Sequence, residues 1–132
     1  MRRVLFALLA AASVCLPHSA LAAECLQAQA DDQAAEGRLE RVRFTDIDYG
    51  NRVETAFILN LAKPACLAGV DEYDQVPSTL KIHVFSTDKP LLDRLQANIG
   101  RHIRVLGSPF GEHTVHHRAP IVMRVTAVKT LP

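Results

Sequence analysis

The sequence predicts a mainly β domain with a single helix. Two observations predict it. Apolar and polar residues alternate along several short segments, and only one segment repeats its apolar residues every four positions behind helix-capping signals. The composition agrees, because 132 residues with 48% hydrophobic and 22% charged side chains suit one globular domain.

Residues 1–22 have the layout of a secretory signal peptide. Met1-Arg2-Arg3 precede an apolar run over residues 4–16, and Ala20-Leu21-Ala22 supply a cleavage site before Ala23. The run is shorter than the roughly 20 residues that a membrane-spanning helix needs. An uncleaved anchor is the alternative. We therefore expect a periplasmic or secreted protein with no membrane span after cleavage.

Two cysteines follow this segment, Cys25 and Cys66, and in an oxidising compartment we expect them to form one disulfide. The alternative, a redox-active pair, usually has C-x-x-C spacing, which these residues lack. The bond would hold residues 23–36, an extended or weakly ordered N-terminal lead-in, to the end of the second predicted strand. Residues 37–132 would then form the folded domain.

Five strands are expected in that domain. Proline and glycine residues mark the ends of two of them. Pro64 should end the second strand, because proline cannot donate a ladder hydrogen bond, and Gly107-Ser108-Pro109 should end the fourth. Leu80, Ile82 and Val84 should point inward from the third strand, and His83 should lie on the opposite face. The predicted strands cover residues 37–44, 54–61, 80–85, 101–106 and 121–128.

The helix is the clearest element. Ser86-Thr87-Asp88 offer an N-cap, Leu91, Leu95 and Ile99 recur every four residues, and Gly100 stands at the C-cap. Three strands, a helix and two strands make up the order of the small five-stranded oligonucleotide/oligosaccharide-binding (OB) barrel. We therefore predict an OB-like barrel, although other small barrels and an open α+β sheet share this order.

The densest polar chemistry is Glu112-His113-Thr114-Val115-His116-His117-Arg118. We predict a ligand-binding site formed by His113, Thr114, His116 and His117, with His83 beside it, since OB-type barrels often bind on the second and third strands. Three imidazoles could instead hold a metal such as Zn or Cu, with His113, His116 and His117 as ligands. A third interpretation is a loop stabilised by Thr and His hydrogen bonds, with one His turned inward.

The sequence argues against nucleic-acid binding and catalysis. Without residues 1–22 the chain carries 13 basic and 14 acidic residues, a net charge of −1, whereas single-strand binders present a basic groove with stacking aromatics. No nucleophile elbow, phosphate-binding Gly loop or HExxH motif is present in the sequence. We therefore expect neither a nucleic-acid partner nor an enzyme.

Four segments together resemble a known family. They are Gly37-Arg38-Leu39, residues 54–66 ending in Leu61-Ala62-Lys63-Pro64-Ala65-Cys66, residues 99–107, and His113-Thr114-Val115-His116-His117. They are similar to small exported bacterial proteins of the domain of unknown function 4431 family over about residues 25–128. The resemblance implies export, a small barrel and the joint occurrence of Cys25 and Cys66, and it implies no activity. Arg118 departs from the pattern, in which another His or a small polar residue is expected, and this weakens the metal interpretation.

These observations lead to a functional hypothesis. We expect a monomeric, non-enzymatic periplasmic binding module whose ligand is a protein, a cell-envelope component or a small molecule. One rival is an inhibitor or immunity protein directed against a secreted toxin or hydrolase. The other is a transition-metal-binding protein that uses the His-rich loop.

Overall fold

A computed structural model describes residues 24–132, and the predicted signal peptide lies outside this range. The described chain is mainly β, as predicted, with the α-helix α1 (Lys89–Ala97) and a short 3₁₀ turn η1 (Glu72–Asp74). Its strands are β1 (Leu26–Gln27), β2 (Gln33–Asp46), β3 (Arg52–Ala68), β4 (Val76–Phe85), β5 (His102–Gly111) and β6 (Ile121–Thr130).

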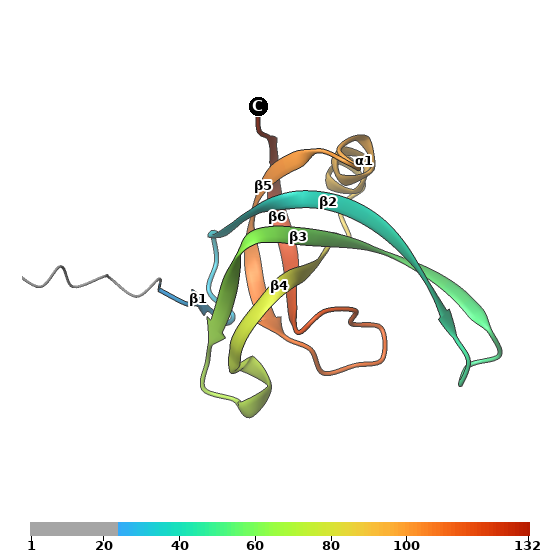
Figure 1. The fold of residues 1–132 in the computed structure, drawn as a ribbon, viewed down its shortest axis with the longest axis horizontal. Helices are drawn as coiled ribbons and strands as arrows, with labels where there is room; N and C mark the ends of the chain where they lie inside the picture. Colours follow the sequence, from blue (N-terminus) through green and yellow to red (C-terminus); the bar gives the residue numbers. More distant parts are fainter. Residues whose placement is uncertain (1–23) are drawn as a thin grey trace, which may run out of the picture.

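One continuous sheet contains all of these strands (Figure 1). β2 pairs antiparallel with β3 and with β5, β5 pairs antiparallel with β6, and β6 lies parallel to β4. β4 also pairs with β3, which is the neighbour of β2, so the hydrogen-bonded strands form a closed ring. The two-residue β1 is added parallel to the end of β3.

The hydrophobic core lies inside this ring of strands. Leu39 of β2, Leu59 of β3 and Ile103 of β5 are fully buried there, and Leu95 covers them from α1. Burying side chains of this size stabilises the fold by about 1.5–3 kcal/mol each. The remaining core members are Leu67, Ile82, Val84, Val105, Ile121, Met123, Val125 and Val128.

The helix begins where the sequence predicts. The Asp88 side chain accepts a hydrogen bond from the N–H of Leu91, and Pro90 occupies the first turn. Its end differs from the prediction, because the helix stops at Ala97 and Ile99 is 37% exposed. Gly100 follows with φ at +81°, a conformation that glycine adopts without strain.

All five predicted strands are longer than predicted, and β4 already starts at Val76 while β6 ends at Thr130. β2 begins at Gln33, inside the expected lead-in, because residues 33–38 pair with β5. β3 continues past Pro64 to Ala68, since the β3–β4 register shifts between Asn60 and Ala65 and Pro64 has no ladder partner in β4. Proline is tolerated at such irregularities.

β5 likewise continues through Gly107-Ser108-Pro109 to Gly111. The Pro109 carbonyl accepts a hydrogen bond from the N–H of Gln29 and therefore faces away from β6. The nitrogen and the carbonyl of a strand residue point to the same side, so the missing N–H of Pro109 removes no hydrogen bond to β6. Gly107 lies at a register shift, where a Cβ atom would come within 2.3 Å of the Arg124 carbonyl oxygen. Glycine permits this close approach of two strands.

Leu80 of β4 also departs from the prediction. Ile82 and Val84 are fully buried as predicted, but Leu80 is 52% exposed. It lies between the pairings of Lys81 and Thr79 with β3, where the register shifts, so strict alternation of faces is interrupted.

The predicted disulfide between Cys25 and Cys66 is present. It joins the residue before β1 to the end of β3, where Leu26 pairs with Leu67. The N-terminal segment is thereby held against the sheet. Among the helices described in residues 24–132, none has the length and apolar character needed to cross a membrane.

Candidate functional site

The β5–β6 loop, residues 112–120, packs on the outer face of the sheet. His83 of β4 is in register with Ile58 of β3 and Val122 of β6 on this face. Ile58 and Val122 are buried although they do not belong to the core inside the ring, and Ala119 of the loop is buried with them. The loop therefore forms a second, smaller packed layer outside the sheet.

His83 anchors the base of this loop. Its Nδ1 accepts a hydrogen bond of 3.2 Å from the backbone N–H of Arg118, so the neutral ring carries its proton on Nε2. Burial lowers the pKa of His83 to about 4, and the neighbouring His117 and Arg118 contribute to the shift. The side chain lies opposite the core, as predicted, but the loop half-buries it.

Arg118 connects the loop to the β2–β3 hairpin. Residues 40–56, which we call the arm, extend beyond the pairings of β2 with β5 and of β3 with β4. In Figure 1 the arm curves over the β5–β6 loop. The Arg118 guanidinium contacts the Glu54 carboxylate at 3.1 Å and lies 4.7 Å from the centre of the Phe44 ring, so both strands of the arm are bound.

Glu54 also binds His116, whose Nδ1 lies 2.8 Å from the second carboxylate oxygen. Hydrogen bonds from His116 and Arg118 lower the pKa of Glu54. Within residues 24–132, the buried Nε atom of Arg118 finds no hydrogen-bond acceptor. The network ties the middle of the loop to β3 by one carboxylate.

The other two imidazoles of the loop stack together. The rings of His113 and His117 lie edge to face with centroids 4.8 Å apart, and Phe110 packs against both at 5.5 and 5.3 Å. His117 Nδ1 accepts from the N–H of His113, while His113 Nδ1 donates to the Gly111 carbonyl. Burial lowers the pKa of His117, with His113 as the next cause, so the arrangement favours a neutral ring.

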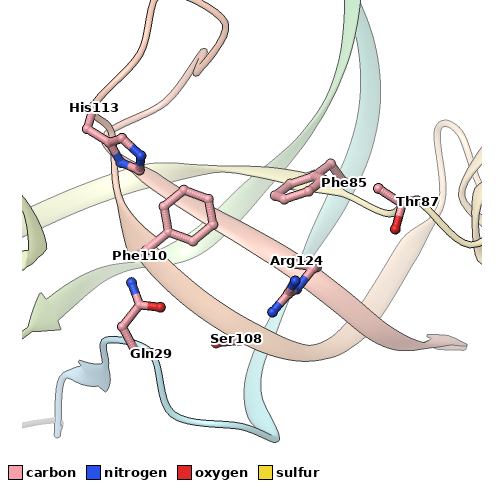
Figure 2. Close-up of a pocket in the computed structure, with 7 residues that line it drawn as sticks. All are labelled: Gln29, Phe85, Thr87, Ser108, Phe110, His113 and Arg124. Carbon is pink, nitrogen blue, oxygen red and sulfur yellow. The ribbon is translucent and has the colours of Figure 1, made fainter.

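A cleft of about 330 Å³ lies beside this cluster (Figure 2). Its floor is the outer face of β4, β6 and β5, where Arg124 is in register with Phe85 on one side and Ser108 on the other. Phe110 and His113 border it toward the loop, and Thr87 borders it beyond β4. The volume is at the lower end of the range for small-molecule sites.

Gln29 closes the remaining side of the cleft. It lies in the turn after β1, and its N–H donates to the Pro109 carbonyl at 2.8 Å. Its φ of +63° is uncommon for a residue with a side chain, and such strained positions persist only where the surroundings hold them. The disulfide four residues earlier supplies part of that restraint.

The structure brings together part of the predicted site. His83, His113 and His117 are linked by ring contacts through Phe110 and Phe85. His116 turns away to Glu54, and Thr114 is exposed, with its carbonyl accepting from the His117 N–H. Of the predicted residues, only His113 lines the cleft.

Sequence reasoning missed the other lining residues, which are Gln29, Phe85, Thr87, Ser108, Phe110 and Arg124. The expected alternation does place Phe85 and Arg124 on the outer face. No sequence signal shows that β4 and β6 are parallel neighbours, and this pairing brings the two residues together. Within residues 24–132, no three His, Cys, Asp or Glu side chains are grouped to hold a metal ion. The metal hypothesis stays a prediction.

Part of the chain is similar to a known protein family. Residues 81–129 match the family model described as Domain of unknown function (DUF4431). The match runs from β4 to near the end of β6 and includes six of the seven residues that line the cleft. No curated protein matches the chain.

Proposed function

We propose that this protein, whose residues 81–129 match the model of the DUF4431 family, is a non-enzymatic binding module of the periplasm or the secreted fraction. The cleft beside the β5–β6 loop carries the proposal. It combines two aromatic rings with a guanidinium, two hydroxyls and an amide, and small-molecule sites typically combine apolar walls with a few convergent polar groups. The ligand would bind there.

We further propose that the ring of strands is an OB-like barrel. The pairing sequence β2, β3, β4, β6, β5 and back to β2 supports it, as does the position of α1 between β4 and β5. In OB barrels the loops after the first and fourth strands flank the ligand. Their counterparts here are the tip of the arm and the β5–β6 loop, and the latter borders the cleft.

The groups in the cleft favour binding over catalysis. Ser108 offers the most buried hydroxyl, yet among the described residues no imidazole or carboxylate hydrogen-bonds to it. A serine nucleophile needs such a base. Export is supported by the N-terminal sequence and by the disulfide, which persists in oxidising compartments.

A second candidate function is inhibition of a secreted protein, and the arm favours it. The tip of the arm projects from the sheet (Figure 1) and exposes Ile47 and Tyr49 at 79% and 62%, with Val115 of the loop beside it at 54%. Exposed apolar and aromatic side chains are frequent in protein interfaces. This site is separate from the cleft.

The two candidates are tested on protein isolated from the envelope fraction of cells that express the full chain. The fraction of an envelope extract that passes a small-molecule filter is added, and the thermal midpoint is measured. We expect it to rise by several degrees, because a ligand that binds only the folded state stabilises it. Thr87→Trp, which fills the cleft from its exposed rim, should abolish the rise.

The matched control is Thr55→Trp, an exposed position on the arm. It should keep the full rise in thermal midpoint. A rise of equal size in Thr87→Trp would show that the ligand binds elsewhere. An Ile47→Asp variant that loses a co-purifying protein while keeping the small-molecule effect would favour the inhibitor instead.

A further inference from the structure

Arg124 is the one charged side chain among the seven residues that line the cleft. Its guanidinium lies at the floor, between Phe85 on β4 and Ser108 on β5 (Figure 2). Within residues 24–132 it has no carboxylate within salt-bridge distance, whereas Arg118 is paired with Glu54 and Arg104 with Glu36. The cleft therefore carries an uncompensated positive charge.

The other polar groups in the cleft can donate hydrogen bonds to oxygen atoms of a ligand. The Ser108 and Thr87 hydroxyls and the Gln29 amide are hydrogen-bond donors that need no ionisation, and they surround Arg124. A guanidinium binds carboxylate and phosphate oxygens through two parallel N–H bonds. None of the seven described residues that line the cleft is acidic, so no carboxylate among them competes with such a ligand.

The apolar walls suit a flat group. The rings of Phe85 and Phe110 meet edge to face, with centroids 6.1 Å apart, and His113 packs on Phe110 from the loop side. Aromatic surfaces in this arrangement offer both a ring face and a ring edge to a further ring. A flat, apolar body can therefore rest on Phe110 while its charged end reaches Arg124.

We propose that the cleft binds a small ligand with a flat apolar body and a single anionic group, either a carboxylate or a phosphate, held by Arg124. This inference rests on the proposed binding function and deepens it. The restraint on Gln29 by the disulfide and by Pro109 would keep the amide donor in place before the ligand arrives. Preorganised donors of this kind lower the entropic cost of binding.

The probes are benzoate, phenyl phosphate and the neutral amide benzamide, titrated into ¹⁵N-labelled full-length protein processed by the cell. We expect benzoate or phenyl phosphate to shift the amide signals of Ser108, Phe110 and Arg124 to saturation. Benzamide should bind at least tenfold more weakly, since it has the same ring without the charge. Tighter binding of benzoate would identify a carboxylate ligand, and tighter binding of phenyl phosphate would identify a phosphate ligand.

Arg124→Gln should raise the Kd of the better anionic probe at least tenfold and leave that of benzamide unchanged. The control Arg101→Gln, an exposed cation outside the cleft, should change either value less than twofold. Equal binding of benzoate, phenyl phosphate and benzamide, or an unchanged Kd in Arg124→Gln, would overturn the anionic ligand and leave the cleft as a binding site. If none of the three probes binds, the proposal of an anionic ligand is also overturned. The Thr87→Trp experiment decides separately whether the cleft binds any ligand.

Discussion

The Nδ1 atom of His83 accepts a hydrogen bond from the backbone N–H of Arg118, 35 residues further along the chain. The contact attaches the β5–β6 loop to the outer face of β4. Because an imidazolium has no acceptor nitrogen, the attachment requires a neutral His83. The position of the loop beside the cleft thus depends on the protonation state of a half-buried side chain.

We predict that the protein loses stability as the pH falls from about 6.5 to about 4. The pKa of His83 is lowered from 6.5 to about 4 in the fold, so in this interval the unfolded chain binds a proton that the native protein does not. Stability from this group is complete above the unfolded pKa. Allowing for solvent screening of a half-buried group, the loss is about 1–2 kcal/mol.

Urea unfolding at pH 7.5 and 5 measures this loss. His83→Asn, whose side-chain oxygen can still accept from Arg118, should show a smaller difference between the two pH values. His102→Asn, an exposed position on β5, should behave as wild type. If the free energy of unfolding changes equally between pH 7.5 and 5 in all three proteins, His83 is not the source of the change.

Arg118 should be needed to hold the loop under the arm. In Arg118→Met the apolar stem remains, but the contacts with Glu54 and the Phe44 ring are lost. We expect a fall of about 1 kcal/mol in the free energy of unfolding, the size of one cation–π contact. Amide hydrogen exchange should accelerate most in residues 112–118, and in the buried part of β6 it should rise only by the global loss of stability.

The control is Arg104→Met, which removes an exposed ion pair with Glu36 at 3.7 Å. Exposed pairs contribute little, so its stability should change by less than about 0.5 kcal/mol. Equal loop exchange in wild type and Arg118→Met would contradict the anchoring role of Arg118.

Asp74 should stabilise Gly111, the last residue of β5, from which the same loop starts. Its carboxylate is buried and accepts a hydrogen bond of 2.7 Å from the N–H of Gly111. Asp74→Ala leaves that N–H without its partner, and we expect a loss of about 1–3 kcal/mol in urea unfolding. Asp74→Asn retains an acceptor oxygen and should lose less. Equal losses in both variants would assign the effect to packing.

Removing the disulfide should loosen one wall of the cleft. Cys25 and Cys66 are 41 residues apart, and a cross-link of this span contributes about 2–4 kcal/mol to stability. We expect that loss on replacing both cysteines by Ala, together with faster amide exchange in residues 25–32. Exchange in β6 should rise only by the global loss of stability. Unchanged exchange at Gln29 would show that Pro109 alone holds the turn.

Much of the architecture was predictable from local patterns. The Asp88 cap, the buried Leu95 and the alternation of Ile82 and Val84 are properties of consecutive residues, and each is present in the structure. The predicted strand ends were wrong where long-range pairing overrides local signals. Pro64 and Pro109 interrupt no ladder because their nitrogen atoms face positions without a partner strand.

The candidate site was less accessible to such reasoning. The dense group of imidazoles predicts a site at residues 113–117. In the structure His116 pairs with Glu54 of a distant strand, and only His113 of this group reaches the cleft. Phe85, Ser108 and Arg124 are unremarkable in their own segments. They become neighbours only because β4, β6 and β5 lie side by side.

The order of residues was enough to establish the β-rich class and the helix with its cap, since alternation and capping act over a few residues. It also predicted the pairing of Cys25 with Cys66, because the two cysteines that follow the predicted signal peptide allow one pairing. The folded arrangement decided which outward-facing side chains meet. A strand presents the same alternating face whichever neighbour it has. The choice of neighbour, made by burial of the common core, assembled the cleft from residues far apart in the chain.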